Sequence, residues 1–495
     1  MSNLDSRQPI LVGAAAIQQR EADPRDAREP LELMIAALEA AAGDAGNRDL
    51  LRRASSIRAP RGFWSYPDPC RLIAERFGAA NARTEVGEIG VLQTTFFGRA
   101  ARDIADGRAD VVLLAGAEAR HRKRTAAKLG IEVANTEQDP SIEPDEVLRP
   151  ARDVLHDLEL SRGLAMPVNQ YSMIENALRA ADGTGVEQHR DELAAFYARF
   201  AAVAADYPGA WNRSAPSAAT IRGDGSNRML AFPYTALHTS QWNVDQAAGF
   251  VMTSVATARA LGIAEDRWVF PHAVVDSNLM LALCERRDPH RCAGFAAAAR
   301  RIAAHTGTAV GDAEHLELYS CFPSAVRLQM REMGVAADRQ VTVTGGMAFA
   351  GGPLNHFAFQ ALARMVAILR GDPGSRGVVT AVSGILTKQG VSMWSSAPPA
   401  SPFLFADVSD ETARESPSVD VVADAAGPGR IVTYTVVYAG DAGVLVALVE
   451  IEGGPRTIAV STDTEFVQRA VSEELCGQPT TVGDGNLTLR KEARG

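Results

Sequence analysis

The sequence passes twice through the same order of turn, helix and strand, and this repetition restricts the possible folds more than any other feature. Each copy contains a glycine turn, an amphipathic helical segment, a further glycine and a short apolar strand. In the order turn, helix and strand, the segments are Gly90, 94–106 and 111–115, then 351–353, 357–369 and 378–382. Two packed copies of one topology explain this pattern most simply, and a chance echo is the alternative. Alternating strands and helices predict an α/β fold with layers around buried sheets.

Further elements follow from hydrophobic periodicity and from the positions of glycine and proline. We predict helices at 31–45, 187–204 and 245–261, and strands at 9–16, 53–59, 83–90, 269–275, 315–320 and 341–344. Residues 396–402 are typical of a linker. After this linker, a small β-domain is predicted from a hairpin of 430–438 and 443–452, a strand at 456–461 and a helix at 463–475.

The segments group into four expected structural parts. These are a first half (1–116 with part of 239–262), an insertion (117–245), a second half (246–396) and a small β-domain (403–495). The chain of 495 residues is long enough for such a division. Single hydrophobic cores stop growing beyond about 250–300 residues.

Composition and charge argue against several classes of partner and site. The formal net charge of −10 disfavours nucleic acids and membrane surfaces, because both are anionic. The five cysteines form no CxxC pair, so we expect neither a disulfide scaffold nor a metal site. The sequence shows no signal-peptide pattern and no apolar run long enough to span a bilayer, and we expect a cytoplasmic location.

Four segments carry a resemblance to the thiolase superfamily, and they occur in that family's order. They are TFFGRAARDIADGRADVVLLAGAEA (95–119), TSQWNVDQAAGFVMTSVATARALG (239–262), TGGMAFAGGPLNHFAF (344–359) and GVVTAVSG (377–384). With ELYSCFPSAV, they resemble most the thiolase-like proteins of type 1, in the branch of the sterol-carrier-protein-x thiolases. The resemblance implies a five-layered αβαβα core of two similar halves, an inserted loop domain that binds coenzyme A, and an additional C-terminal domain of the oligonucleotide/oligosaccharide-binding (OB) type. Such proteins are acyltransferases of the acetyl-CoA acetyltransferase kind.

The resemblance also indicates which residues occupy the family's catalytic positions. The nucleophilic cysteine corresponds to Gly90, its activating histidine to Gly352, the second cysteine to Val382, and the polar loop residue to Tyr319. Without a nucleophile, covalent catalysis is lost, so we expect no thiolase activity by the usual route. The amides of Gly90 and Gly384 are expected to keep an anion hole, and such a donor is worth about 3 kcal/mol in a working enzyme.

Tyr319 and His356 are the candidate catalytic residues. A phenol at Tyr319 would protonate or stabilise an enolate, and the alternative is a buried tyrosine with a satisfied hydroxyl. His356 lies one helical turn after Gly352, and the alternative is a helix-capping or surface histidine. We expect Cys321 to be a small buried residue and Lys388 to be solvated.

A basic cluster opens the insertion and is a candidate binding site for the phosphates of coenzyme A. Its members are His121, Arg122, Lys123 and Arg124. The alternative is a solvated helix face.

Three functions remain open. The first is a thiolase-like protein that binds coenzyme A or an acyl-CoA, holds no permanent cofactor and lacks thiolase activity. The second is a retro-aldolase acting on a β-hydroxyacyl-CoA, and the third is a scaffold for a partner enzyme. We expect a homodimer if a long sheet edge is bare, or a monomer if the C-terminal domain covers it.

Overall fold

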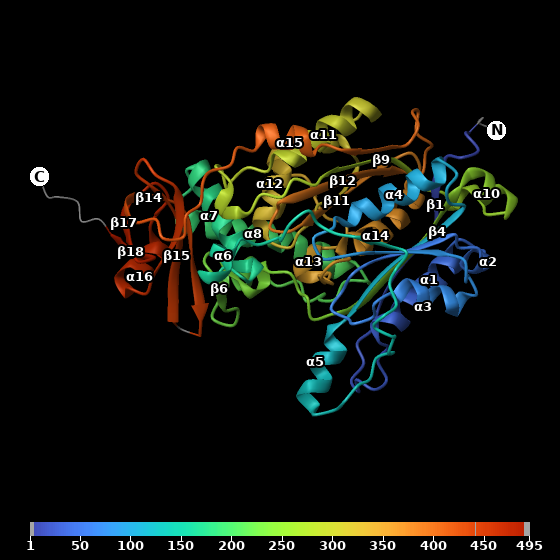
Figure 1. Cartoon of the computed structure of the whole chain (residues 1–495), viewed down its shortest axis with the longest axis horizontal. Helices are drawn as coiled ribbons and strands as arrows, with labels where there is room; N and C mark the ends of the chain where they lie inside the picture. Colours follow the sequence, from blue (N-terminus) through green and yellow to red (C-terminus); the bar gives the residue numbers. More distant parts are fainter. Residues whose placement is uncertain (1–3, 441, 490–495) are drawn as a thin grey trace, which may run out of the picture.

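The computed structural model describes residues 4–440 and 442–489, and its body contains two mixed sheets (Figure 1). The strand order of the first sheet is β1 (Pro9–Gln18), β8 (Asp245–Ser254), β4 (Val111–Ala119), β2 (Ser56–Pro60), β3 (Arg83–Gly87) and β5 (Glu146–Leu148). The order of the second is β10 (His315–Glu317), β11 (Arg376–Ser383), β12 (Lys388–Ser395), β9 (Phe270–Ser277) and β13 (Leu404–Asp407).

The two sheets repeat one topology. In the series β1-β8-β4-β2, the successive pairings are antiparallel, antiparallel and parallel. The series β9-β12-β11-β10 has the same three pairings in the same order. The predicted pair of similar halves is therefore confirmed.

Helices form the other three layers of the core. Helix α1 (Pro30–Asp44) packs on the outer face of the first sheet, and α11 (Ala293–Thr306) packs on the outer face of the second. Between the sheets lie α4 (Gln93–Ala105) and α14 (Phe357–Gly371), which contact strands of both (Figure 1). The result is the expected αβαβα arrangement.

Aromatic side chains join the two halves at the centre of the molecule. Phe97 on α4 contacts Phe250 on β8 with ring centroids 5.1 Å apart, Phe359 on α14 at 4.8 Å and Trp394 on β12 at 5.8 Å. All four residues are at most 2 % exposed. Edge-on contacts of this kind add to the stabilisation that burial of the rings already provides.

The predicted helix at 245–261 is wrong over its first ten residues. Those residues form β8, a wholly buried strand between β1 and β4, and only the end is helical, as α10 (Val255–Ala260). A side chain at Gly249 would begin only 2.6 Å from the backbone of Ala37 on α1. A continuous apolar run has no period that distinguishes a buried strand from a buried helix.

The segment predicted as a strand at 341–344 is also not a strand. It is a loop that wraps the carboxylate of Glu317, which accepts hydrogen bonds from the backbone N–H groups of Val343 (2.7 Å) and Thr344 (2.9 Å). The alternating apolar and polar residues at 341–344 therefore belong to a loop that binds a buried carboxylate and not to a strand.

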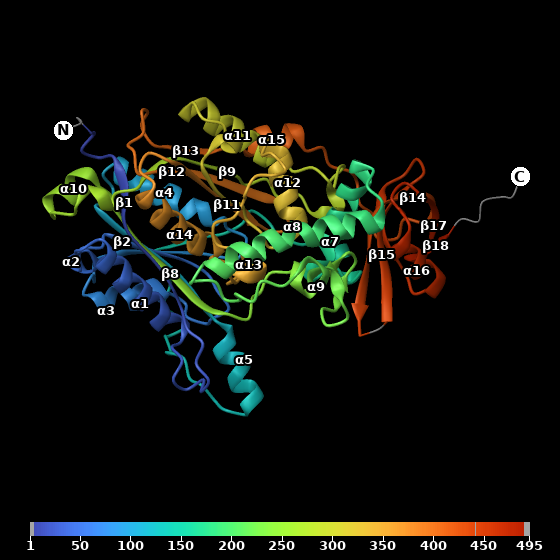
Figure 2. The ribbon, with the colours of Figure 1, turned by 180° about the vertical axis from the view of Figure 1, so that it is seen from behind.

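The insertion supplies helices on one side of the core. They are α5 (Arg120–Leu129), α6 (Asp157–Ser161), α7 (Pro167–Asp182), α8 (Val186–Asp206) and α9 (Ala218–Gly223), followed by β6 (Met229–Ala231) and β7 (Tyr234–Thr235). Figure 2 shows α7 and α8 against the core, while α5 projects away from it. In the described part of the chain, no helix is long and apolar enough to cross a membrane.

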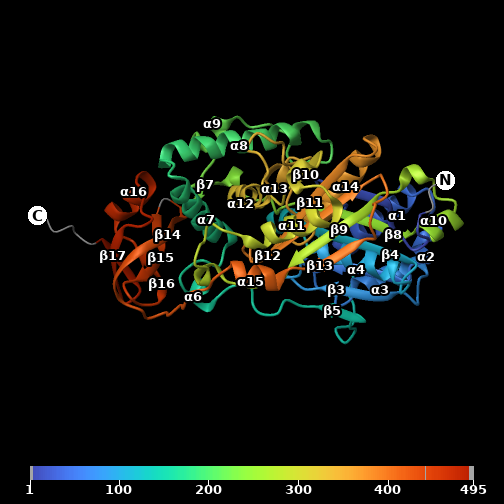
Figure 3. The same ribbon diagram turned by 90° about the horizontal axis from the view of Figure 1, so that it is seen from above.

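A five-stranded barrel lies at one end of the molecule (Figure 3). It consists of β14 (Gly427–Ala439), β15 (Ala442–Ile451), β16 (Arg456–Ser461), β17 (Pro479–Gly483) and β18 (Asn486–Leu489), with α16 (Thr464–Ser472) between the third and fourth strands. The pairings β14-β15-β16-β18-β17-β14 close the circuit, as in an OB-type barrel. The small C-terminal β-domain is thus confirmed.

The barrel is fastened to the insertion and not only to its own linker. β6 pairs with β14, and Asn176 on α7 donates from Nδ2 to the carbonyl of Tyr434 at 2.8 Å. The chain between the halves and the barrel first adds β13 to the second sheet and forms α15 (Ser409–Glu415) against α11. Residues 404–415 therefore pack with the second half.

Candidate functional site

A cavity of about 480 Å³ lies between the insertion and the loops of the second half. Four of the sequence-predicted positions lie on its wall: Tyr319, Gly352, Val382 and Gly384. The insertion adds Met166, which precedes α7, and Tyr171 from its first turns, and Trp242 comes from the segment before β8. We call this space the central cavity.

The Tyr319 loop is held rigidly beside the central cavity. The backbone N–H of Tyr319 donates to Thr380 Oγ1 at 2.7 Å, and its carbonyl accepts from Gln329 Nε2 at 2.8 Å. Its ring packs edge-on against Phe357. Burial raises the pKa of the Tyr319 hydroxyl further above its usual range, so the phenol stays protonated and is able to donate.

Gly90 lies in the turn before α4, next to Ile89 on the cavity wall. Its φ is +109°, a conformation that favours glycine. A Cβ at this position would lie 2.8 Å from Cγ of Pro150, a rigid ring. The turn has no room for a cysteine side chain unless Pro150 moves.

The expectation of a solvated Lys388 is wrong. The side chain is 4 % exposed, and its ammonium donates to the Gly90 carbonyl at 2.7 Å. Asp276 holds the following residues, since its carboxylate accepts from Thr94 at 2.6 Å and Thr95 at 2.7 Å. Residues of the second half thus fix the turn at Gly90 and the first turn of α4.

The Gly352 position is also crowded, although less rigidly. Its N–H donates to the carbonyl of Gln241 at 2.8 Å, and a Cβ here would lie 1.8 Å from Ser240 Oγ. Rotation of the Ser240 hydroxyl would relieve that contact, so a small side chain is tolerable at this position and a histidine requires a larger rearrangement.

The segment around Val382 and Gly384 forms the opposite part of the wall. Gly384 has a φ of +64°, and its carbonyl accepts from the hydroxyl of Tyr171 at 3.4 Å. Arg286 donates from Nη2 to the next carbonyl, that of Ile385. The turn is therefore held by side chains from two different parts of the fold.

Cys321 lines the central cavity, whereas His356 does not. His356 is 2 % exposed, does not line the central cavity and faces Gly116 on β4. Burial lowers its pKa to about 3, which leaves the imidazole neutral. Cys321 does line the cavity, but burial raises its pKa to about 12, so it is a thiol and not a thiolate nucleophile.

A second, more polar cavity of about 970 Å³ lies beside the central cavity, and Trp242 lines both. Its cations are Arg120, Arg122, Lys123 and Arg124, all at the start of α5. His121, the remaining member of the predicted cluster, packs against Trp211 instead, with ring centroids 5.3 Å apart. We call this space the basic cavity.

The cations of the basic cavity have no carboxylate partner among the described side chains. Arg120 stacks on Trp242 at 4.0 Å and on Phe63 at 4.6 Å. Arg122 is 9 % exposed and donates to Asn135 and to the carbonyl of Ala134, and its Nε is unpaired. Cations are unfavourable at a helix N-terminus, and this arrangement therefore suits an anionic ligand.

Glu118 lies on the wall of the basic cavity without pairing these cations. It accepts a hydrogen bond from the backbone N–H of Phe63 at 2.9 Å, and burial raises its pKa to about 7. Within the ranges 4–440 and 442–489, no group of three His, Cys, Asp or Glu side chains is placed to hold a metal ion.

Sequence reasoning misses several cavity residues. Tyr171, Met166 and Trp242 reach the site only through the folding of the insertion, and no local pattern marks them. Tyr319, Gly352 and Gly384 line the cavity at positions to which the family motifs point.

Solved structures provide the comparison with known proteins. The monomeric SCP2-thiolase-like protein type 1 from Mycobacterium smegmatis matches with a TM-score of 0.83 and 26 % identity, over 98 % of this chain and 100 % of its own. No protein-family model matches the sequence, and no curated protein matches it.

Two further matches cover less of the chain. The Ltp2-ChsH2(DUF35) aldolase matches with a TM-score of 0.61 and 18 % identity, over 79 % of this chain and 98 % of its own. The acetyl-CoA acetyltransferase from Syntrophomonas wolfei matches with a TM-score of 0.57 and 16 % identity, over 80 % of this chain and 100 % of its own.

Proposed function

Because this chain has the thiolase-like fold, we propose that it binds coenzyme A or an acyl-CoA thioester without forming a covalent acyl-enzyme. The acyl thioester occupies the central cavity, and the phosphates of coenzyme A occupy the basic cavity. Trp242, which lines both spaces, borders the path between them.

The crowding at Gly90 carries the non-covalent part of this proposal. A cysteine there would need both the +109° φ and the space that Pro150 fills. The only cysteine on the wall of the central cavity, within the described residues, is Cys321, whose raised pKa keeps it protonated. Covalent catalysis needs an activated nucleophile, and these features argue against one.

The basic cavity supports the coenzyme A part. Arg120, Arg122, Lys123 and Arg124 offer several guanidinium and ammonium donors with no competing carboxylate partner in the part of the chain that the structure describes. Guanidinium groups match the geometry of phosphate oxygens. Phe63 and Trp242 also line this cavity and hold the Arg120 guanidinium, which stacks on both rings.

Calorimetric titration with coenzyme A and with a medium-chain acyl-CoA tests the proposal. We expect binding near micromolar that weakens with salt, because screening acts on exposed charges. The double variant Lys123→Gln/Arg124→Gln should bind about three- to tenfold more weakly. Lys128→Gln is the matched control, since Lys128 lies on the last turn of α5 and does not line the cavity. Absence of binding to either ligand would refute the proposal.

Retro-aldol cleavage of a β-hydroxyacyl-CoA is the second candidate. It is favoured by the protonated hydroxyl of Tyr319 on the cavity wall, which would give its proton to the enolate carbon and take in exchange the proton that the substrate's β-hydroxyl loses as the carbon–carbon bond breaks. One of the matched structures is itself an aldolase by name. Since neither His356 nor Gly90 lines the cavity, Tyr319 with the amide of Gly384 forms the proposed machinery.

Product analysis with β-hydroxyacyl-CoA substrates distinguishes the two candidates. Cleavage by the wild type that falls at least tenfold in Tyr319→Phe, with unchanged substrate affinity, favours the aldolase. Cleavage that survives the substitution would exclude this role of Tyr319. If no cleavage occurs, a co-purification experiment should search for a partner enzyme that needs this chain.

A further inference from the structure

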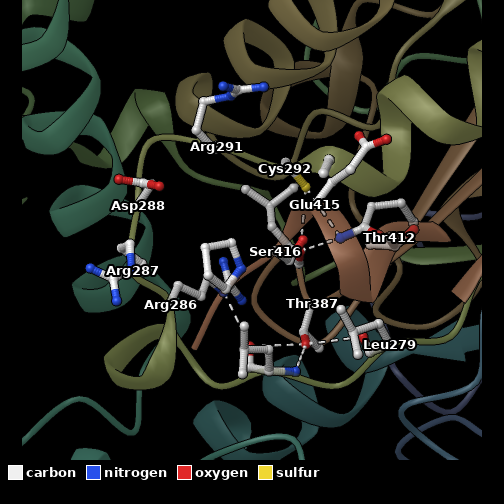
Figure 4. A pocket seen from close by; sticks show the side chains of 15 residues that line it. Leu279, Arg286, Arg287, Asp288, Arg291, Cys292, Thr387, Thr412, Glu415 and Ser416 are labelled. Atoms are coloured by element: carbon white, nitrogen blue, oxygen red, sulfur yellow. Dashed lines mark hydrogen bonds between the residues drawn. The ribbon is translucent and has the colours of Figure 1, made fainter. Parts of the chain in front are cut away.

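A third cavity, of about 40 Å³, adjoins the turn that forms one wall of the central cavity. Figure 4 shows the side chains that line it. Val382, Ser383, Gly384 and Ile385 face the central cavity, and the following residues Leu386 and Thr387 line this rear pocket. Arg286, Arg287 and Ser416 lie on its other walls.

Arg286 is a buried cation with no described carboxylate in direct contact. It is 8 % exposed, and it donates from Nε to the carbonyl of Leu281 at 3.1 Å and from Nη2 to the carbonyl of Ile385. No carboxylate of the described residues lies within ion-pair distance of it. Its third nitrogen, Nη1, bonds no described protein group.

Nearby charges are engaged elsewhere or point to solvent. Arg291 pairs with Glu332 at 2.7 Å, and Glu415 pairs with Arg300 at 2.6 Å. Arg287 and Asp288 are exposed. The buried carboxylate of Glu159 accepts from the backbone of Cys284 and His156 instead. Glu159 acts on the Arg286 charge only from a distance, and no described carboxylate bonds the guanidinium directly.

An isolated buried charge is unfavourable, and an arginine does not relieve the cost by losing its proton. Burial lowers the pKa of Arg286, although the charge of Glu159 acts in the opposite direction. The pocket is large enough for more than one water molecule, because a water needs only about 10–15 Å³ of such space. It is too small for a phosphate ester or an acyl chain.

We propose that the rear pocket binds a small monovalent anion of the halide class, with Arg286 as its principal ligand. Arg287 supplies a second cation at the mouth. The hydroxyl of Ser416, which bonds no other described residue, supplies a further donor. The bound anion braces the turn at 384–387 from behind and joins the segment at 412–417 to it. This site does not depend on what the central cavity binds.

Thermal unfolding of the whole protein in different sodium salts tests this site. At constant ionic strength, gluconate is replaced stepwise by chloride, since gluconate is too large for the pocket. We expect a saturable rise in the Tm of about 1–3 °C. The rise should shrink in Arg287→Gln and persist in Arg301→Gln, which removes an exposed charge away from the pocket. Equal Tm values in the two salts would overturn the proposal.

Arg286→Met removes the principal ligand and should abolish the chloride effect. Because Arg286 also holds the carbonyls of Leu281 and Ile385, its replacement endangers the fold, and bromide soaking of wild-type crystals gives an independent measurement. An anomalous peak within hydrogen-bond distance of Arg286 Nη1 is the expected result. A pocket that holds only water, with no anomalous peak, would contradict the assignment.

Discussion

At single residues, the site is shaped by backbone groups and by charges that the fold buries. The turn at Gly90 is held by Lys388 from behind and is closed by Pro150 in front. The Lys388 ammonium donates a hydrogen bond to a carbonyl oxygen, and no carboxylate of the described residues contacts it directly. A buried hydrogen bond from a charged group contributes about 1.5–3 kcal/mol.

Replacement of Lys388 by methionine should therefore loosen the turn at Gly90. We expect a loss of about 1–3 kcal/mol in the free energy of unfolding, because the Gly90 carbonyl is left without its donor. Urea unfolding measures this change. Lys128→Met, an exposed substitution on α5, is the control and should stay within about 0.5 kcal/mol of the wild type.

Glu118 should make stability depend on pH. Burial raises its folded pKa from 4.5 to about 7. Between these values the folded state binds more protons than the unfolded state, so stability falls as pH rises from about 4.5 through 7. Glu118→Gln removes this loss. Denaturant unfolding should find the variant more stable than the wild type by roughly 2–3 kcal/mol at pH 8, with the difference almost gone at pH 4.5. A difference that does not vary with pH would contradict the assignment.

At the scale of elements, α4 and its counterpart α14 connect the two sheets. Phe97 lies at the contact of β8, α14 and β12. Phe97→Ala should cost about 3–5 kcal/mol, because it leaves a cavity that three elements line. Urea unfolding with tryptophan fluorescence is the measurement. Phe63→Ala removes a ring that is 47 % exposed, and it should cost far less.

Long periodic segments and ordered motifs are what the sequence predicts well. The two similar halves and the C-terminal β-domain agree with expectation, and Tyr319, Gly352 and Val382 line one cavity. The prediction of a helix at 245–261 is wrong because β8 is apolar on both faces, so its sequence shows no alternation that would indicate a strand. The contributions of Tyr171 and Trp242 depend on how the insertion folds against the core, and no local signal encodes that.

At the scale of the whole molecule, one side of each sheet is extended by a short strand from outside the two halves. β5 of the insertion pairs beside β3, and β13 of the inter-domain segment pairs beside β9. Segments of the same chain therefore occupy the positions at which another subunit would add strands. The C-terminal barrel itself docks on α7, away from these edges.

We expect this chain to be a monomer in solution. Sedimentation equilibrium over a wide concentration range measures the mass. Val147→Pro, in the centre of β5, removes a backbone donor and should expose β3. Self-association that appears only in this variant would support the role of β5. A dimeric wild type would show that another surface mediates assembly.

Because Pro150 packs against Gly90, substitutions at these two positions are tolerated in only one order. Pro150 belongs to the insertion and Gly90 to the first half, so the two positions are 60 residues apart and change independently. A cysteine substituted at Gly90 while Pro150 is present would clash with the proline ring, and the positive φ would strain its backbone. The space for a cysteine side chain at Gly90 exists only after Pro150 has been replaced. A nucleophile can therefore be engineered at Gly90 only after Pro150 in the insertion has been replaced. The same order applies to natural substitutions at these two positions.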